Sequence, residues 1–115
     1  MGRLTTHVLD TMRGKPADRV AIRLFRLAKR RELVSSVTTN LDGRTETALL
    51  DEVSMSTGTF ELEFDIADYF ARQEVELAEP AFLDTVVIRF SLRADENYHV
   101  PLLVSPWAYS TYRGS

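Results

Sequence analysis

A strict alternation of apolar and acidic side chains in residues 60–66 most constrains what this chain can fold into. The apolar positions are Phe60, Leu62, Phe64 and Ile66, and the acidic positions between them are Glu61, Glu63 and Asp65. A period of two residues is that of a β-strand, whose side chains point to opposite faces in turn. The segment therefore predicts a strand with one buried and one charged face, and such a strand needs a second layer to cover its apolar side.

Five further segments have the composition of strands. They are residues 4–10, 20–27, 33–39, 85–92 and 100–104. Turn-forming residues separate several of them, including Gly14 and Pro16 after the first segment and Asn40-Leu41-Asp42-Gly43 after the third. Residues 45–57 show no clear period and are expected to form a loop.

One short helix is expected directly after residue 65. Ile66, Tyr69 and Phe70 would share one helical face, and the helix should end near Glu74. Asp65 can serve as its N-cap, because a carboxylate accepts hydrogen bonds from the free N–H groups of the first turn. Further along, residues 95–97 (Asp-Glu-Asn) predict a hairpin turn between the strand at 85–92 and the closing strand.

These elements predict an all-β fold, a sandwich of two four-stranded sheets with one short helix. With 115 residues, 44% hydrophobic, the chain is expected to form a single domain over residues 1–115. An open sandwich leaves unpaired strand edges. Apolar side chains also lie on the outward face near the C-terminus, including Leu103. Pairing into an oligomer is therefore expected.

Charge and composition favour some partners and cellular locations over others. The net charge is −3, with acidic and basic residues interspersed, which disfavours a nucleic-acid surface. The basic run at residues 26–31 is expected to be a solvated strand end and turn. The chain has no cysteine, no apolar signal-peptide run at its start and no segment long enough to cross a bilayer, so a cytoplasmic location without membrane contact is expected.

The two histidines of the chain, His7 and His99, lie in the same phase of their predicted strands. Each alternates with core positions and should therefore point outward from the sandwich. A single outward histidine is usually a surface residue. Two of them in one phase, the second beside an aromatic-rich C-terminal segment, leave a surface role and a catalytic role about equally open.

Arg44, Tyr112 and Ser115 are further candidates for a site. Arg44 follows an Asp-Gly turn and could be a solvated loop residue, but its guanidinium offers a planar fork of donors suited to a flat ring rich in carbonyl oxygens. Tyr112 and Ser115 belong either to a disordered tail or to a site. The two histidines show no metal-ligand spacing with a third ligand, so no metal is expected. The chain has neither a phosphate-binding glycine loop nor a nucleophile elbow.

Three motifs together resemble one known family. They are Leu4-Thr5-Thr6-His7-Val8-Leu9-Asp10 with Gly14-Lys15-Pro16-Ala17, Asn40-Leu41-Asp42-Gly43-Arg44, and Tyr112-Arg113-Gly114-Ser115. In this order and at these positions they resemble the 5-hydroxyisourate hydrolases, the enzymatic branch of the transthyretin family. The resemblance runs from residue 4 to residue 115 and so covers nearly the whole chain.

The resemblance implies a fold, an activity and a set of site residues. The fold would be a transthyretin-like sandwich assembled as a homotetramer of two edge-paired dimers. The activity would be hydrolysis of 5-hydroxyisourate to 2-oxo-4-hydroxy-4-carboxy-5-ureidoimidazoline in urate catabolism, without a cofactor. The catalytic residues would be His7, Arg44 and His99, and the substrate-binding residues His7, Arg44, Tyr112 and Ser115. The alternative is a non-catalytic transthyretin-like carrier of a small aromatic ligand, and the hormone carriers of this fold lack the two histidines and the Tyr-Arg-Gly-Ser ending.

Overall fold

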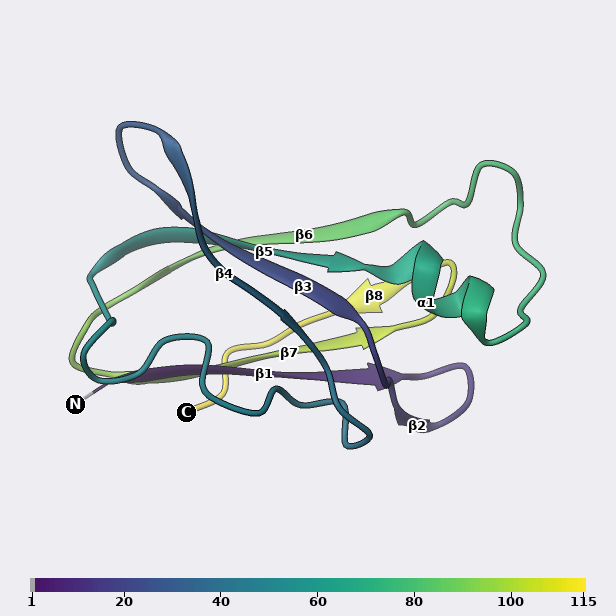
Figure 1. The fold of residues 1–115 in the computed structure, drawn as a ribbon, viewed down its shortest axis with the longest axis horizontal. Coiled ribbons are helices and arrows are strands. Elements are labelled where there is room, and N and C mark those ends of the chain that lie inside the picture. The colour runs from purple at the N-terminus through teal and green to yellow at the C-terminus, as the bar shows by residue number, and fades with distance from the viewer. Residues whose placement is uncertain (1) are drawn as a thin grey trace.

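The computed structural model describes residues 2–115 as two four-stranded sheets packed face to face, with one short helix at one end (Figure 1). The first sheet has the strand order β2-β1-β7-β8 and the second the order β4-β3-β5-β6. The elements are β1 (Arg3–Asp10), β2 (Lys15–Pro16), β3 (Ala21–Leu27), β4 (Arg31–Thr38), β5 (Gly58–Asp65), α1 (Ile66–Arg72), β6 (Thr85–Leu92), β7 (Asn97–Val104) and β8 (Tyr109–Ser110). The predicted all-β sandwich with one helix is confirmed.

The first sheet is built around a parallel pair, β1 and β7. In this pair Thr5 lies opposite His99, and His7 lies opposite Pro101. All the other strand pairs are antiparallel. The parallel pair joins two segments more than ninety residues apart, and the intervening chain, which forms the second sheet, serves as the crossover connection that a parallel pair needs.

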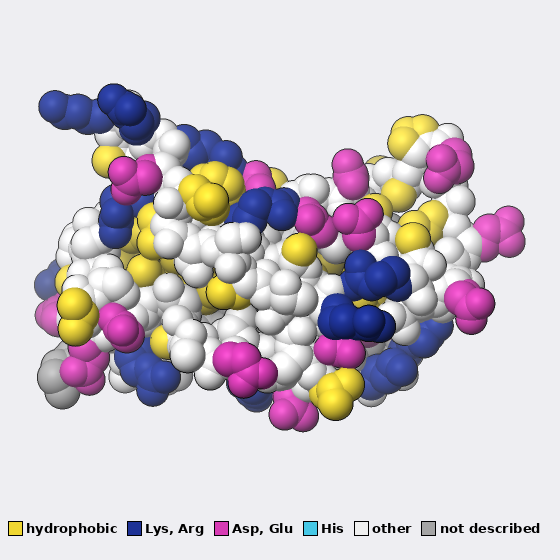
Figure 2. All heavy atoms as spheres, in the orientation of Figure 1, with side chains coloured by type: hydrophobic (Ala, Val, Ile, Leu, Met, Phe, Trp, Pro, Cys, Tyr) yellow, Lys and Arg dark blue, Asp and Glu magenta, His cyan; other side chains and the backbone are white. Residues whose placement is uncertain are grey.

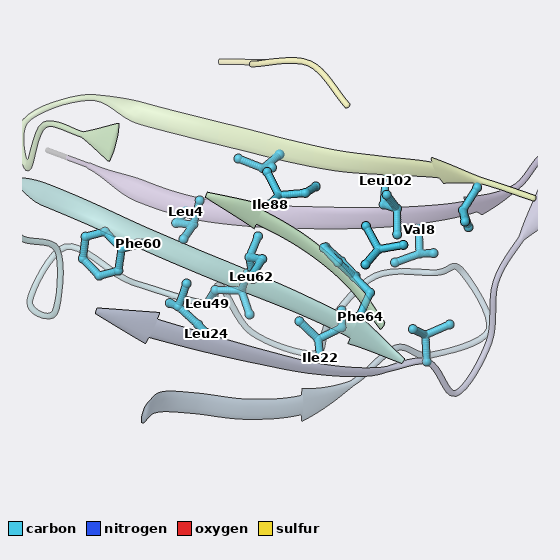
Figure 3. Packing of buried hydrophobic residues seen from close by; sticks show 14 of the residues in the cluster. Leu4, Val8, Ile22, Leu24, Leu49, Phe60, Leu62, Phe64, Ile88 and Leu102 are labelled. Carbon is cyan, nitrogen blue, oxygen red and sulfur yellow. The ribbon is translucent and has the colours of Figure 1, made fainter. Parts of the chain in front are cut away.

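The core lies between the two sheets, where the alternating apolar side chains of both inner faces meet (Figure 3). Leu4 and Val8 of β1 face the core together with Leu62 and Phe64 of β5, and all four are fully buried. The loop at 45–57 has no strand, as predicted, but it buries Leu49 and Leu50 against the core. Leu4 accepts a backbone hydrogen bond from Leu49 and donates one to Leu50, which closes this loop over β1.

Residues 95–97 do not form the predicted hairpin turn. β6 lies in the second sheet and β7 in the first, so the segment crosses between the layers instead of joining neighbouring strands (Figure 1). Turn-forming composition gives a change of chain direction, but it does not determine whether the next strand pairs with the previous one. That choice depends on the distant partner β1, which sequence periodicity does not reveal.

Asp65 precedes the helix as predicted, but its side chain makes no capping hydrogen bond. Its carboxylate instead binds the guanidinium of Arg23 through two hydrogen bonds of 2.6 and 2.9 Å. The charged pair satisfies the carboxylate more strongly than a neutral backbone N–H would. The helix ends at Arg72, two residues before the predicted position.

The acidic face of β5 points away from the core, as predicted, but it is less solvated than alternation implies. Glu61 is only 8% exposed, because the guanidinium groups of Arg31 and Arg89 cover its carboxylate at 3.1 and 2.9 Å. Arg31 also lies over the ring of Phe25 at 3.6 Å. The basic run at 26–31 thus forms the exposed β3–β4 turn, as predicted, while Arg31 reaches back to the sheet. Acidic and basic side chains are interspersed on the face in Figure 2.

The C-terminal segment is ordered against the first sheet. β7 ends at Val104, and a tight turn, closed by a hydrogen bond from Ser105 N to Ala108 O (2.8 Å), leads into β8. Pro106 lies in this turn, and Trp107 is exposed there. Among the described residues no helix is long and apolar enough to span a bilayer.

Asp10, at the end of β1, is fully buried and holds the helix onto the first sheet. Its carboxylate accepts hydrogen bonds from the backbone of Met12 and Arg13 (3.0 Å each) and from the hydroxyl of Tyr69 on α1 (2.8 Å). This contact raises the pKa of the Tyr69 phenol, together with burial of the ring, which has the larger effect. The pair therefore links β1, the turn after it and the helix through one buried charge.

We expect Tyr69→Phe to lower the free energy of unfolding by about 1–3 kcal/mol, because it removes a donor from a buried carboxylate. Denaturant unfolding measures this change. Combining it with Asp10→Asn gives the control, since two residues that act through one contact should show losses that do not add. Full additivity would contradict the coupling.

Candidate functional site

His7 and His99 lie side by side on the outward face of the first sheet. Their ring centres are 6.5 Å apart and the ring planes are tilted by 40°. The strand register explains this placement: Thr5 is opposite His99, so His7 lies two residues further along β1 and is a diagonal neighbour. Both side chains are half-buried. The prediction that the two histidines share the outward phase is confirmed.

The loop after β4 brings Arg44 to the side of His7. Arg44 forms an isolated β-bridge with His7, and Gly43 O accepts a hydrogen bond from Val8 N (2.8 Å). The amide side chain of Asn40 organises the turn, because its oxygen accepts from the backbone N–H groups of Asp42 (2.9 Å) and Arg44 (3.2 Å). Arg44 thus starts from a fixed backbone position beside the first histidine.

Gly43 permits this close approach. It has a φ of +72°, which L-residues with side chains rarely adopt. A Cβ atom here would come within 2.4 Å of Val8 O and 3.2 Å of His7 Cδ2. The glycine of the Asp-Gly-Arg motif therefore allows the loop to approach β1 closely, and this approach fixes the backbone position of Arg44.

The C-terminal tail closes the opposite side, beside His99. Gly114 forms an antiparallel bridge with His99 through backbone hydrogen bonds of 2.7 and 3.1 Å. Arg113 holds the tail to the crossover segment, since its guanidinium binds Glu96 Oε1 (3.1 Å) and lies 4.4 Å from the ring centre of Tyr98. Thr111 adds a hydroxyl hydrogen bond to Pro101 O (2.7 Å). The tail is thus attached along β7.

Tyr112 and Ser115 lie on this attached tail, and both are exposed. The tyrosine side chain is 60% exposed. The structure therefore brings the backbone of the tail to His99 but leaves the Tyr112 and Ser115 side chains in solvent.

Both histidines have a pKa below the ordinary value of 6.5. Partial burial is the main cause in each case, and the positive charge of Arg44 adds to it. His7 further lowers the pKa of His99, while the backbone and charge of Asp42 act on His7 in the opposite direction. Both imidazoles are therefore neutral near pH 7, and each retains one nitrogen that can accept a proton.

Arg44 has no carboxylate within ion-pair distance among residues 2–115, unlike the arginines of the second sheet. Its charge is therefore available for a ligand. A cavity of about 180 Å³ lies beside it, with Thr5, Arg44 and Thr47 in its wall. No three His, Cys, Asp or Glu side chains in the described part of the chain converge as a metal site requires.

Sequence reasoning missed Thr5, whose hydroxyl lies 2.9 Å from Nδ1 of His99. The sequence does indicate that Thr5 shares the outward face of its strand with His7. It does not indicate that Thr5 pairs with His99, because the parallel register between β1 and β7 cannot be derived from periodicity.

The family model described as "HIUase/Transthyretin family" matches residues 4–114 of this chain. Two relatives named 5-hydroxyisourate hydrolase are similar over nearly their full length. The protein from Ralstonia nicotianae is 52% identical, with 100% of both chains covered. A protein from Rhizobium meliloti, named 5-hydroxyisourate hydrolase 2, is 53% identical, with 99% of this chain and 97% of the relative covered.

Three solved structures are similar to this chain. A structure of (S)-allantoin synthase superposes with a TM-score of 0.94 at 44% identity and covers 99% of this chain, which spans 44% of that protein. The 5-hydroxyisourate hydrolase of Klebsiella pneumoniae has a TM-score of 0.82 at 30% identity, with both chains fully covered. Sea bream transthyretin in complex with thyroxine shares the fold, with a TM-score of 0.87 at 24% identity over 97% of this chain and 94% of its own. On the family match and these full-length similarities, this chain belongs to the HIUase/Transthyretin family.

Proposed function

We propose that this protein is an enzyme that hydrolyses 5-hydroxyisourate to 2-oxo-4-hydroxy-4-carboxy-5-ureidoimidazoline. The observation that carries the proposal is the convergence of two neutral imidazoles and one unpaired guanidinium on one sheet face. The relatives named for this reaction support the substrate.

The spacing of the rings suits a water molecule held between them. Ring nitrogens lie little more than an ångström from the ring centre, so centres 6.5 Å apart leave the nitrogens too distant for a direct hydrogen bond. A neutral imidazole takes a proton from this water as its oxygen attacks a ring amide carbonyl. The C–N bond then breaks, and the proton passes to the leaving nitrogen.

Arg44 binds the ring and stabilises the oxyanion that develops on the attacked carbonyl. Its planar fork of N–H donors matches the carbonyl oxygens of a flat heterocycle. Because no carboxylate of the described chain neutralises Arg44, its full charge acts on the transition state. We assign Tyr112 and Ser115 to substrate binding, with the tail as one wall of the site and a role in orienting the ring.

A non-catalytic carrier of a small aromatic ligand is the alternative for this fold. The likeness to thyroxine-bound transthyretin is at 24% identity and supports the fold alone. A carrier also gives no reason for two neutral histidines beside an unpaired arginine. The hydrolase is therefore the proposed function.

We further propose a single transthyretin-like domain that assembles as a cytoplasmic homotetramer with the site where subunits meet. The turn and tail after β7 expose Trp107, Tyr109 and Tyr112, an apolar surface unusual for a monomer. An assembly that covers the outward face of the first sheet would also exclude bulk water from the site. Sedimentation velocity measures the assembly, and cell fractionation measures the location.

We expect the wild-type protein to accelerate the ultraviolet decay of 5-hydroxyisourate made in situ by urate oxidase. His7→Ala and His99→Ala should each lower kcat/KM by about 10²–10⁴-fold, because each removes a proton-transfer or positioning group. Both side chains are on the outward face, so circular dichroism and sedimentation should be unchanged. Lys29→Ala, at the exposed β3–β4 turn, is the control. Near-normal decay with either histidine variant would exclude the dyad.

The pH dependence should follow the histidines. Activity requires the neutral form, so it should be complete at neutral pH and fall as pH drops through a midpoint below 6.5. Arg44 lowers both pKa values, so Arg44→Gln should move both histidine midpoints to higher pH. Titration of the ring protons by NMR measures them independently of turnover. Unchanged midpoints in the variant would show that Arg44 does not act on the rings.

Deleting residues 112–115 should strongly reduce turnover. The deletion removes the Gly114 bridge to His99 and the Arg113 contact with Glu96, but no core side chain. The thermal midpoint should therefore change little. Equal activity in truncated and intact protein would exclude the tail from the site, whereas loss of the folded state would show that it supports the sheet.

A further inference from the structure

A hydrogen bond connects the outward faces of β1 and β7 directly beside the proposed water site. Thr5 Oγ1 and His99 Nδ1 are 2.9 Å apart. The two residues are partners in the parallel register, so their side chains leave the sheet at the same level. It is the one side-chain hydrogen bond that His99 makes within the described residues, and it fixes the orientation of the His99 ring.

The direction of this bond determines where the His99 ring carries its proton. A neutral imidazole has one N–H and one lone pair. A threonine hydroxyl always carries one hydrogen, and within residues 2–115 the Thr5 hydroxyl has no hydrogen-bond partner besides His99. If Thr5 donates, its hydrogen and the Nδ1 lone pair are both satisfied. If it accepts, its own hydrogen is left to solvent on a face that the substrate must cover.

We propose that Thr5 is a positioning residue, whose hydroxyl donates to Nδ1 of His99 and thereby holds the ring proton on Nε2. This assignment deepens the proposed hydrolysis and rests on it for its catalytic meaning. His99 then presents an N–H donor to the site. The free lone pair needed to deprotonate water belongs to His7, which identifies His7 as the general base.

The resulting step balances. The water oxygen bonds to the ring carbonyl carbon while His7 accepts the water proton. The carbonyl–nitrogen bond then breaks, and His7 returns this proton to the leaving nitrogen. His99 keeps its own proton throughout and donates a hydrogen bond from Nε2 that orients the water or the developing oxyanion. The His99 imidazole therefore never has to give up its last proton.

The position of Thr5 in the cavity wall allows a second role, direct contact with the substrate. The two roles differ in kinetics. A residue that only binds substrate raises KM when it is removed, whereas one that orients a catalytic group lowers kcat. The split between kcat and KM therefore separates them.

The test compares three variants of the full-length protein. Thr5→Val keeps the shape of the side chain but removes the hydroxyl, and it should lower kcat by about 10–100-fold with little change in KM. Thr5→Ser restores the hydroxyl and should recover most of kcat. Thr59→Val is the matched control, because Thr59 is a strand threonine of the second sheet whose hydroxyl lies 2.9 Å from the Ser91 hydroxyl and bonds no histidine. Thr59→Val should leave the kinetics unchanged.

Nitrogen-15 NMR of labelled histidine reads the proton position without substrate. Wild-type His99 should show a protonated Nε2 and an unprotonated, hydrogen-bonded Nδ1, and Thr5→Val should show a mixture of both tautomers. A wild-type proton on Nδ1, or an unchanged kcat in Thr5→Val, would overturn the proposal. Absence of turnover in the wild type would instead refute the hydrolase function, and the nitrogen spectra would still decide the role of Thr5.

Discussion

The parallel pairing of β1 with β7 is the constraint on which the rest of the structure depends. It joins the first strand of the chain to the seventh and buries alternate side chains of both, among them Val8 and Leu102. The same alternation turns His7 and His99 outward at neighbouring levels. Because the side-chain period of a strand is two, a slip of one residue in either strand would bury one histidine and expose a core residue. Stability of the core and geometry of the site are therefore fixed by one register.

Two segments without regular structure extend this sheet on either side of the histidines. The loop carrying Gly43 bonds β1, and the tail carrying Gly114 bonds β7, each through backbone groups at the level of a histidine. A Cβ at Gly43 would clash with Val8 O, and one at Gly114 would lie 3.1 Å from His99 Cβ. Glycine thus allows the backbone to approach closely, which brings Arg44 to one side of the pair and the C-terminal residues to the other.

The sequence was sufficient to predict most strands, their phase and the outward direction of both histidines, because these follow from local alternation. It was insufficient for long-range pairing. The segment at 95–97 was assigned to a hairpin because turn composition does not reveal a partner strand on the other sheet, and Thr5 was missed for the same reason. Glu61 was expected in solvent, yet its charge allows two arginines to cover it. Local patterns identify faces, whereas contacts between distant residues decide what lies on them.

The arginines of the second sheet have carboxylate partners and Arg44 on the first sheet has none among the described residues, a difference that supports the proposed position of the site. On the second sheet each strongly held arginine has carboxylate partners, as Arg23 has Glu63 and Asp65. Because the carboxylates neutralise the arginine charges in such pairs, little net positive charge is left to attract a ligand. On the first sheet Arg44 has no carboxylate partner among the described residues. Its positive charge lowers the pKa values of two half-buried imidazoles, those of His7 and His99. An unpaired cation destabilises neighbouring protonated bases and attracts an electron-rich ring. The same charge thus adds to the effect of burial in keeping the histidines neutral, and in the proposed reaction it would bind the substrate.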